Sequence, residues 1–181
     1  MLMGIALMTA LSACAAMQQP RQKASEANPV VETATPPNAG VILYSVSPRI
    51  EKHPPAGSLP RILLSLGGAR SREGEGRMFR AYVEITHDYK GPQHFAFATF
   101  GGADRIGTRY LAHDSHCDPS GACQYQETVS VPLPEAEVRS AAQDHRALRF
   151  RIHGSEAYVS VAIPASYTSA LLAKMDAAPG S

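Results

Sequence analysis

The stretch LRFRIHGSEAYVSVAI, residues 148–163, decides the fold of this chain. Its first half places Leu148, Phe150 and Ile152 at every second position, and apolar residues alternate with polar or small ones again over residues 157–163. A period of two is typical of strands that bury one face and expose the other. We therefore predict two neighbouring strands joined by a short turn.

A turn of two residues, Gly154 and Ser155, fits this pattern because it sets apolar side chains opposite apolar ones. Phe150 then faces Val159 across the hairpin. Glycine at the first position suits the type II′ geometry of such turns. A turn of three residues would set apolar side chains against polar ones, so the pattern favours the tight hairpin.

The same period appears in several segments that precede this hairpin. Strands are predicted at residues 41–46, 61–66, 79–85, 94–100 and 108–116, with a polar, glycine-bearing loop at 67–77. Short helices are predicted over 134–143 and 166–174, the second packing Leu171, Leu172 and Met175 on a sheet. We therefore expect a mainly β fold, an antiparallel β-sandwich of about seven or eight strands with two short helices.

The composition fits one globular domain. The chain has 181 residues, 44% of them hydrophobic, and its 17 basic and 16 acidic residues leave a net charge of +1. Near-neutral charge argues against a nucleic-acid partner, because such binding needs a basic face that neutralises phosphates. The absence of Trp and an aromatic content of 7% also argue against exposed stacking platforms for single strands or sugars.

An uncharged and mostly apolar run covers residues 2–13. It is too short to span a bilayer, which needs about 20 helical residues, and is typical of the apolar part of an export signal. The run ends in Leu11-Ser12-Ala13-Cys14, which resembles the lipobox of bacterial lipoproteins. The resemblance implies that signal peptidase II removes the signal peptide, residues 1–13, and that Cys14 carries a diacylglycerol and a further acyl chain such as palmitate.

The same resemblance implies a membrane address. Several acyl chains on one residue hold a protein firmly, since each buried methylene contributes about 0.8 kcal/mol. Among lipoproteins an Asp after the cysteine tends to retain the protein in the inner membrane, so Ala15 implies the outer membrane, with the body facing the periplasm. The body, as far as Ile163-Pro164-Ala165-Ser166-Tyr167, resembles small envelope lipoproteins of Gram-negative bacteria, a likeness that implies no activity.

Residues 14–40 are polar beyond the lipidated cysteine and contain Pro20, Pro29, Pro36 and Pro37. Such a segment buries too little apolar surface to offset the entropy lost on ordering. We interpret it as a flexible linker of about 25 residues that joins the anchor to a single β-sandwich domain over residues 41–181.

Cys117 and Cys123 remain once the lipidated cysteine is set aside, and they enclose the turn-forming sequence Asp-Pro-Ser-Gly. In the oxidising cell envelope we expect a disulfide across the end of a hairpin. The bridge closes a very short loop and should act locally. A redox-active pair is the alternative, but that chemistry usually needs Cys-x-x-Cys at a helix start.

Two kinds of chemistry remain as alternatives near this hairpin. His113, Asp114 and His116 offer ligands for zinc or copper, although positions three apart on a strand point to opposite faces. The hairpin also sets His113 opposite Glu127, which suggests a general base with its orienting carboxylate for a hydrolase. No nucleophile is identifiable beside them, and Gly-x-Ser-x-Gly, phosphate-binding glycine loops and His-Glu-x-x-His are missing from the sequence.

Positive charge gathers around the last hairpin, at Arg139, Arg146, Arg149, Arg151 and His153. This cluster suits lipid head groups, lipopolysaccharide or an acidic partner, and the alternative is an ordinary solvated strand face. We therefore expect a non-enzymatic binding or structural module of the cell envelope, whose partner is another envelope protein or a glycan and which needs no cofactor. A metal-binding lipoprotein and a hydrolase are the alternative functions.

Overall fold

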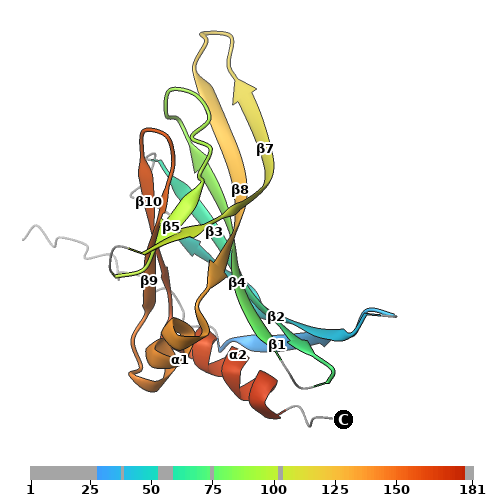
Figure 1. The fold of residues 1–181 in the computed structure, drawn as a ribbon. Coiled ribbons are helices and arrows are strands. Elements are labelled where there is room, and N and C mark those ends of the chain that lie inside the picture. The colour runs from blue at the N-terminus through green and yellow to red at the C-terminus, as the bar shows by residue number, and fades with distance from the viewer. Residues whose placement is uncertain (1–27, 38, 53–58, 74–75, 102–103, 178–181) are drawn as a thin grey trace, which may run out of the picture.

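The computed structural model describes residues 28–37, 39–52, 59–73, 76–101 and 104–177, which Figure 1 draws in colour. The predicted signal peptide, residues 1–13, and the predicted lipidation site Cys14 lie outside the described residues. Among the helices of the described part, none has the length and apolar character needed to cross a bilayer.

The fold is mainly β, and its strands form two antiparallel sheets. The larger sheet has six strands in the order β1 (Val30–Ala34), β2 (Val41–Lys52), β3 (Arg61–Ser71), β4 (Arg77–His87), β8 (Cys123–Leu133) and β7 (Arg109–Cys117). The smaller sheet has four, in the order β10 (Tyr158–Ile163), β9 (Leu148–His153), β5 (Phe97–Thr99) and β6 (Arg105–Gly107). The predicted antiparallel sandwich with two helices is confirmed, and its described part contains more strands than expected because several are short.

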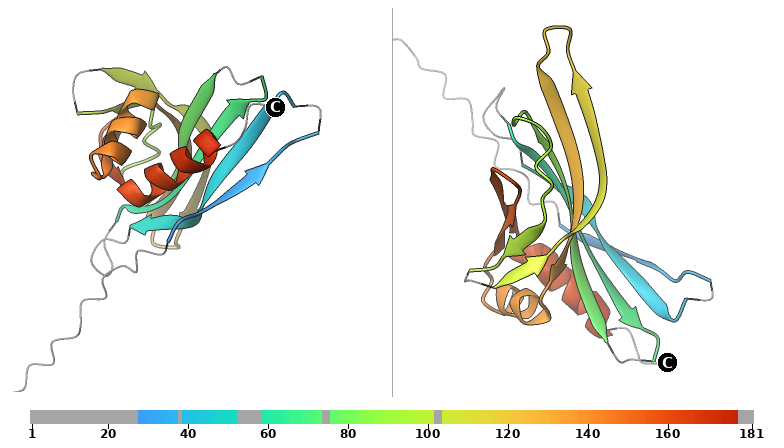
Figure 2. Two further views of the ribbon diagram at one scale, coloured as in Figure 1. Left: turned by 90° about the horizontal axis from the view of Figure 1, so that it is seen from below. Right: turned by 45° about the horizontal axis from the view of Figure 1, so that its top comes forward.

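The two sheets and two helices enclose one core. Helices α1 (Glu135–Gln143) and α2 (Ala165–Ala177) lie together at one end of the sheets, while the β7–β8 hairpin extends from the other end (Figure 1). Figure 2 shows the smaller sheet lying against one side of the larger one. The apolar positions of the alternating strands fill the space between them, as at Val83, Phe150 and Val161. Burying each such side chain stabilises the fold by about 1.5–3 kcal/mol.

Helix α2 packs as predicted, with Leu171, Leu172 and Met175 buried. Met175 lies so close to Gly68 of β3 that a Cβ atom there would come within 2.7 Å of its Sδ. The neighbouring Gly67 lies under the Tyr44 carbonyl, 3.1 Å from where its Cβ would be. The predicted loop at 67–77 is therefore wrong over its first half, because β3 continues to Ser71. These glycines allow close packing inside a strand and do not mark a turn.

Strand β1 corrects the predicted linker. Its five residues lie inside the segment 14–40 that we expected to be flexible throughout, and Val30–Ala34 pair with β2 from Ser47 to Leu43. Most of the β1 side chains are exposed. An extended polar segment can join a sheet edge through its backbone hydrogen bonds, so it does not need the apolar burial on which the prediction was based.

In the hairpin of β9 and β10, apolar residues pair with apolar residues as predicted, but the connecting loop is longer than predicted. Phe150 pairs with Val161 and Ile152 with Val159, so apolar residues still face one another, but Phe150 does not face Val159 as predicted. Four residues, 154–157, connect the strands in place of two. Gln93 explains the wider loop, because its carbonyl accepts the Ser155 N–H at 2.7 Å and its side-chain oxygen accepts the Glu156 N–H at 3.0 Å.

The segment before β5 also differs from the prediction. A strand was expected over 94–100, whereas β5 covers Phe97–Thr99 and lies between β9 and β6. His94 has a φ of 49°, in the left-handed region, which ends any continuous strand there. Its backbone N–H donates instead to Glu127 on β8.

We expect Gly154→Ala to destabilise the fold, because the added Cβ would lie 2.7 Å from the Gln93 Cβ and 3.0 Å from the Gln93 carbonyl oxygen. The cost should be about 1–3 kcal/mol, measured by urea unfolding. Gly40→Ala is the matched control, since nothing lies within 4 Å of its added carbon, and should stay within about 0.5 kcal/mol of the parent chain. Equal stability of the two variants would refute this packing.

Candidate anion-binding site

The predicted cysteine bridge is present at the end of the β7–β8 hairpin, where Cys117 and Cys123 pair and form a disulfide. Asp118 organises the turn. Its carbonyl accepts the Gly121 N–H at 3.0 Å, and its carboxylate accepts the backbone N–H groups of Ser120 at 2.8 Å and Ala122 at 3.1 Å. A hydrogen bond from the Ser120 hydroxyl, followed by the one from Ala122, holds the pKa of the Asp118 carboxyl below its usual value.

The residues of the metal hypothesis do not form a cluster. His113, Asp114 and His116 lie on β7, whose residues are all exposed. Strand geometry sends His113 and His116 to opposite faces. In the part of the chain that the structure describes, no group of three or more His, Cys, Asp or Glu residues is placed to hold a metal ion.

The structure does not support the arrangement that the hydrolase hypothesis needs, in which Glu127 orients the His113 side chain. His113 lies opposite Glu127, as predicted. The carboxylate of Glu127 is nevertheless fully buried, whereas His113 is exposed. None of the hydrogen bonds within the described ranges joins these two side chains. The histidine that Glu127 contacts is His87 on β4, whose Nε2 lies 2.8 Å from Oε1.

Glu127 collects donors from three neighbouring segments. Its Oε1 accepts from His87 and, at 2.6 Å, from the Gln93 N–H, and its Oε2 accepts from the His94 N–H at 2.9 Å. The Tyr110 hydroxyl donates to the same carboxylate. Because His87 Nδ1 accepts the Tyr89 N–H, its proton sits on Nε2 and points at the carboxylate.

These contacts decide the charge state of the carboxyl group. Burial alone raises the pKa of Glu127, but the hydrogen bonds from Gln93, His87, Tyr110 and His94 outweigh it, and the pKa lies below its usual value. Burial and the hydrogen bond to Glu127 raise the pKa of Tyr110 to about 12. A carboxylate that already accepts four donors is a structural anchor and has little capacity left to act as a base.

The structure divides the five residues of the predicted basic cluster into two groups. Arg139 belongs to α1 and contacts Glu135 at 2.7 Å and Asp176 of α2 at 3.5 Å. Arg146, after α1, contacts Asp144 at 3.2 Å. Both guanidinium groups therefore have carboxylate partners at the helical end of the molecule. Arg149, Arg151 and His153 instead lie on the outer side of β9, away from the core.

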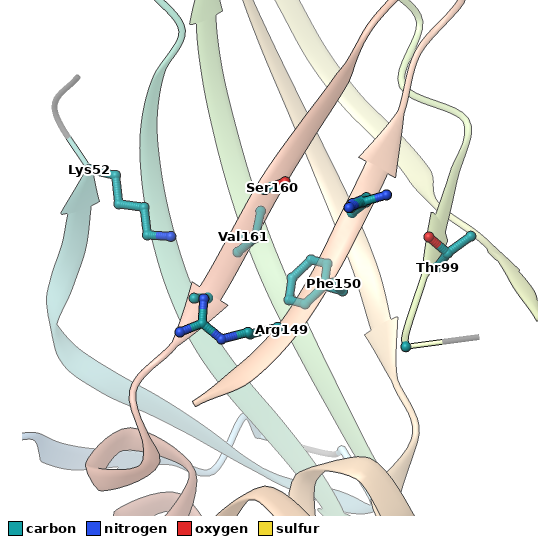
Figure 3. A pocket seen from close by; sticks show the side chains of 9 residues that line it. Lys52, Thr99, Arg149, Phe150, Ser160 and Val161 are labelled. Carbon is teal, nitrogen blue, oxygen red and sulfur yellow. The ribbon is translucent and has the colours of Figure 1, made fainter. Parts of the chain in front are cut away.

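A cleft with a volume of about 480 Å³ opens on this outer side, between β9, β10 and the end of β2 (Figure 3). We call it the basic cleft, and the described residues that line it are Lys52, Thr99, Gly101, Arg149, Phe150, Arg151, Ser160, Val161 and Ala162. Three of these side chains are cationic, two carry hydroxyl groups, and none is Asp or Glu. A concave surface that gathers several donors without an acceptor carboxylate is suited to an anion.

Lys52 and Arg149 approach the cleft from different sheets. Figure 3 shows the two side chains pointing toward one another across β10, Lys52 from the end of β2 and Arg149 from β9. The residue that pairs with Arg149 is the small Ala162, which leaves room for the guanidinium to lie across the strand. Partial burial, and then the positive charge of Arg149, hold the pKa of the Lys52 ammonium below its usual value. An anion bound between them would relieve this repulsion.

A ladder of side chains runs beside the cleft across the smaller sheet. Its members, each packed on the next, are Arg105, Phe97, His153, Tyr158 and Arg151. The rings of Phe97 and His153 are stacked with centroids 4.7 Å apart, and each end of the ladder is a guanidinium over a ring, at 4.6 Å and 5.1 Å. Phe97 thus has a neighbour on both ring faces. The ladder orients Arg151, and it offers no bare face of Phe97 on which a base or sugar could stack.

A second hollow, of about 410 Å³, lies on the outer face of the larger sheet. Leu43, Met78 and Tyr82 line much of it and are partly exposed. Its polar contributions come from Ser45, Ser65 and Arg80, and it lacks the convergent charges of the basic cleft. A binding site usually combines concavity with a few converging polar groups, so the basic cleft is the stronger candidate.

Comparison of this chain with protein-family models, with curated proteins and with solved structures finds no significant match in any of the three. The candidate site is therefore defined by its geometry alone. Sequence reasoning identified Arg149 and Arg151 but missed Lys52, Thr99 and Ser160. The outward position of Ser160 on β10 was a signal that could have identified it, whereas no sequence signal places β2 beside β10.

We expect Glu127→Gln to destabilise the fold at neutral pH by about 2 kcal/mol, because the amide would turn an N–H group toward backbone donors. For the parent chain the free energy of unfolding should fall as the pH drops below about 4.3, the ordinary pKa of glutamate in an unfolded chain, since the folded carboxyl has the lower pKa. Urea unfolding from neutral to acidic pH measures both effects.

The exposed Glu32 provides the control for this pair of measurements. Glu32→Gln should leave the free energy of unfolding at neutral pH within about 0.5 kcal/mol of the parent chain. If Glu127→Gln retained the full acid sensitivity of the parent chain, the buried carboxylate would not be its source.

Proposed function

We propose that this protein is a lipid-anchored, non-enzymatic module of the bacterial outer membrane that binds an anionic component of the cell envelope in the basic cleft. The observation that carries the proposal is that Lys52, Arg149 and Arg151 line one concave surface, whose described lining residues include no carboxylate. The bound component is an acidic envelope glycan, lipid head group or protein segment.

The anchor part of the proposal is supported by the sequence around Cys14. The apolar run and the Leu-Ser-Ala-Cys motif together favour lipid attachment, and the polar segment that follows would leave the body free to reach its ligand. Strand β1 begins at Val30, so the proposed tether comprises the residues between Cys14 and that strand.

The binding part is supported by what surrounds each cation. Arg139 and Arg146 have carboxylate partners at the helical end, whereas the lining of the basic cleft supplies only donors. Partial burial and the positive charge of Arg149 disfavour the ammonium form of Lys52, and a bound anion would offset the repulsion between the two cations. The Glu127 carboxylate, which the hydrolase hypothesis assigned to orienting His113, instead accepts hydrogen bonds from His87, Tyr110 and two backbone N–H groups, which favours binding over catalysis.

The anchor is tested by replacing Cys14 with Ser. The parent chain should appear in the outer-membrane fraction with its amino terminus at an acylated Cys14, detected by mass spectrometry. Cys14→Ser should leave the membrane fraction or remain with its signal peptide attached. Recovery of the parent protein with an unmodified Cys14 in an uncleaved chain would contradict the proposal.

Binding is tested with two polyanions of different chemistry, polyphosphate and polygalacturonate, titrated into the purified acylated protein in neutral detergent. We expect at least one to bind, with an affinity that falls as salt rises, because counterions are released on binding. The double variant Lys52→Gln, Arg149→Gln should lose about tenfold or more in affinity, equivalent to roughly 1.4 kcal/mol.

Arg146→Gln removes one positive charge from the helical end and serves as the control for a charge lost outside the cleft. Its affinity should remain close to that of the parent chain. If neither polyanion bound, or if Arg146→Gln weakened binding as much as the double variant, the basic cleft would not be the binding site.

A further inference from the structure

The basic cleft carries more positive charge than is needed to neutralise a single carboxylate. A carboxylate has two oxygens and one negative charge, which one guanidinium fork can satisfy alone. Here two guanidinium groups and an ammonium share one cavity. A ligand group that matches them must carry more charge and more acceptor oxygens. A phosphate monoester meets both conditions, with about −1.5 to −2 charges at neutral pH and three terminal oxygens.

The donors also surround the cavity in a way that suits a tetrahedral group. Lys52 reaches it from the larger sheet, and Arg149 and Arg151 come from β9. The hydroxyl groups of Ser160 and Thr99 lie on the strands to either side, since Ser160 and Thr99 both pair with Arg151. Donors on several sides of one cavity fit the three oxygens of a phosphate better than the planar fork of a carboxylate.

Thr99 and Arg151 are held in place before any ligand arrives. The Thr99 hydroxyl lies 3.0 Å from His153 Nε2, and it keeps its hydrogen for a ligand when that ring nitrogen carries the hydrogen and donates. Tyr158 packs against the Arg151 guanidinium. Side chains that are already ordered lose less entropy when they bind. The ladder that orders them leaves no bare face of Phe97 for stacking, so charge and hydrogen bonding dominate recognition.

On the basis of the proposed function, we propose that the ligand group of the basic cleft is a phosphate monoester, held by Lys52, Arg149 and Arg151 with Ser160 and Thr99 as hydroxyl donors. The cavity volume of about 480 Å³ exceeds that of a phosphate alone and leaves room for the sugar or lipid head group that carries it. The ligand class is thus a phosphorylated glycan or glycolipid head group.

Four small probes separate this ligand class from other anions, with affinities measured by calorimetry on the purified acylated protein in neutral detergent. They are glucose 6-phosphate, glucose 6-sulfate, glucuronate and glucose. We expect glucose 6-phosphate to bind at least about tenfold more tightly than the sulfate or the carboxylate at neutral pH, because it alone carries close to two charges. Glucose should not bind.

The second ionisation of the phosphate provides an independent test of the ligand class, through the dependence of the affinity on pH. The second pKa of a phosphate monoester is about 6, so the fraction of dianion rises roughly tenfold from about pH 5 to about pH 7. The affinity for glucose 6-phosphate should rise with it. Glucose 6-sulfate keeps its charge over this range, so any change in its affinity comes from the protein. The groups in question include His153, which lies beside Thr99, and Lys52, which lies near Arg149. The ratio of the two affinities isolates the ligand's own titration.

Two lipid probes distinguish the sources of the phosphate. A short-chain phosphatidate presents a monoester and the matching phosphatidylglycerol a diester, both used as dispersed monomers. Tighter binding of phosphatidate than of glucose 6-phosphate indicates a lipid head group, and equal binding indicates a soluble phosphorylated sugar. Binding of phosphatidylglycerol as tight as that of phosphatidate contradicts the monoester.

Variants connect the result to the cleft. Lys52→Gln and Arg149→Gln should each weaken glucose 6-phosphate binding about tenfold, while Arg146→Gln should leave it unchanged. Unaltered urea unfolding curves establish that the variants are folded. If sulfate or glucuronate binds as tightly as phosphate, the monoester inference is wrong while the anion-binding function stands. If no probe and neither polyanion binds, both are wrong.

Discussion

The buried carboxylate of Glu127 is the contact on which the arrangement of the two sheets depends. A charge taken out of water is costly unless hydrogen bonds replace its hydration, and here the replacement comes from His87, Tyr110 and two backbone N–H groups before β5. Gln93, fixed by this carboxylate, in turn holds the loop between β9 and β10. One side chain on the larger sheet therefore reaches, through a single intermediate residue, the hairpin that carries the candidate site.

The basic cleft depends on this connection because it belongs to neither sheet alone. Lys52 comes from the end of β2, and its neighbours come from β5, β9 and β10. The helical end of the molecule has a different electrostatic design, with arginines paired to acids within or between α1 and α2. The arginines at the helical end are thus neutralised by carboxylates of the protein itself. The cations on the outer side of the smaller sheet could instead be neutralised by a ligand. This contrast is the physical basis for placing function at the cleft.

The sequence predicted features that depend on local periodicity and turn chemistry. The alternation in β4, β9 and β10, the proline that precedes α1, and the hairpin between Cys117 and Cys123 all follow from neighbouring residues, and the structure confirms them. Features that depend on distant contacts were missed. The loop after β9 has four residues because of Gln93, β1 forms because β2 offers an edge, and Gly67 and Gly68 remain in a strand because of Tyr44 and Met175. Lys52 was missed for the same reason, since only the packing of one sheet on the other brings it near Arg149.

The position of β10 gives Lys52 and Arg149 a protective effect that does not depend on any ligand. β10 is one of the two edge strands of the smaller sheet, and Lys52 lies beside it (Figure 3). Bare backbone along such a strand is a template on which a neighbouring chain can extend the sheet, and lysine at the border is a common natural deterrent. Wherever copies of this chain are concentrated, this charge would discourage polymerisation through β10 and keep each molecule separate.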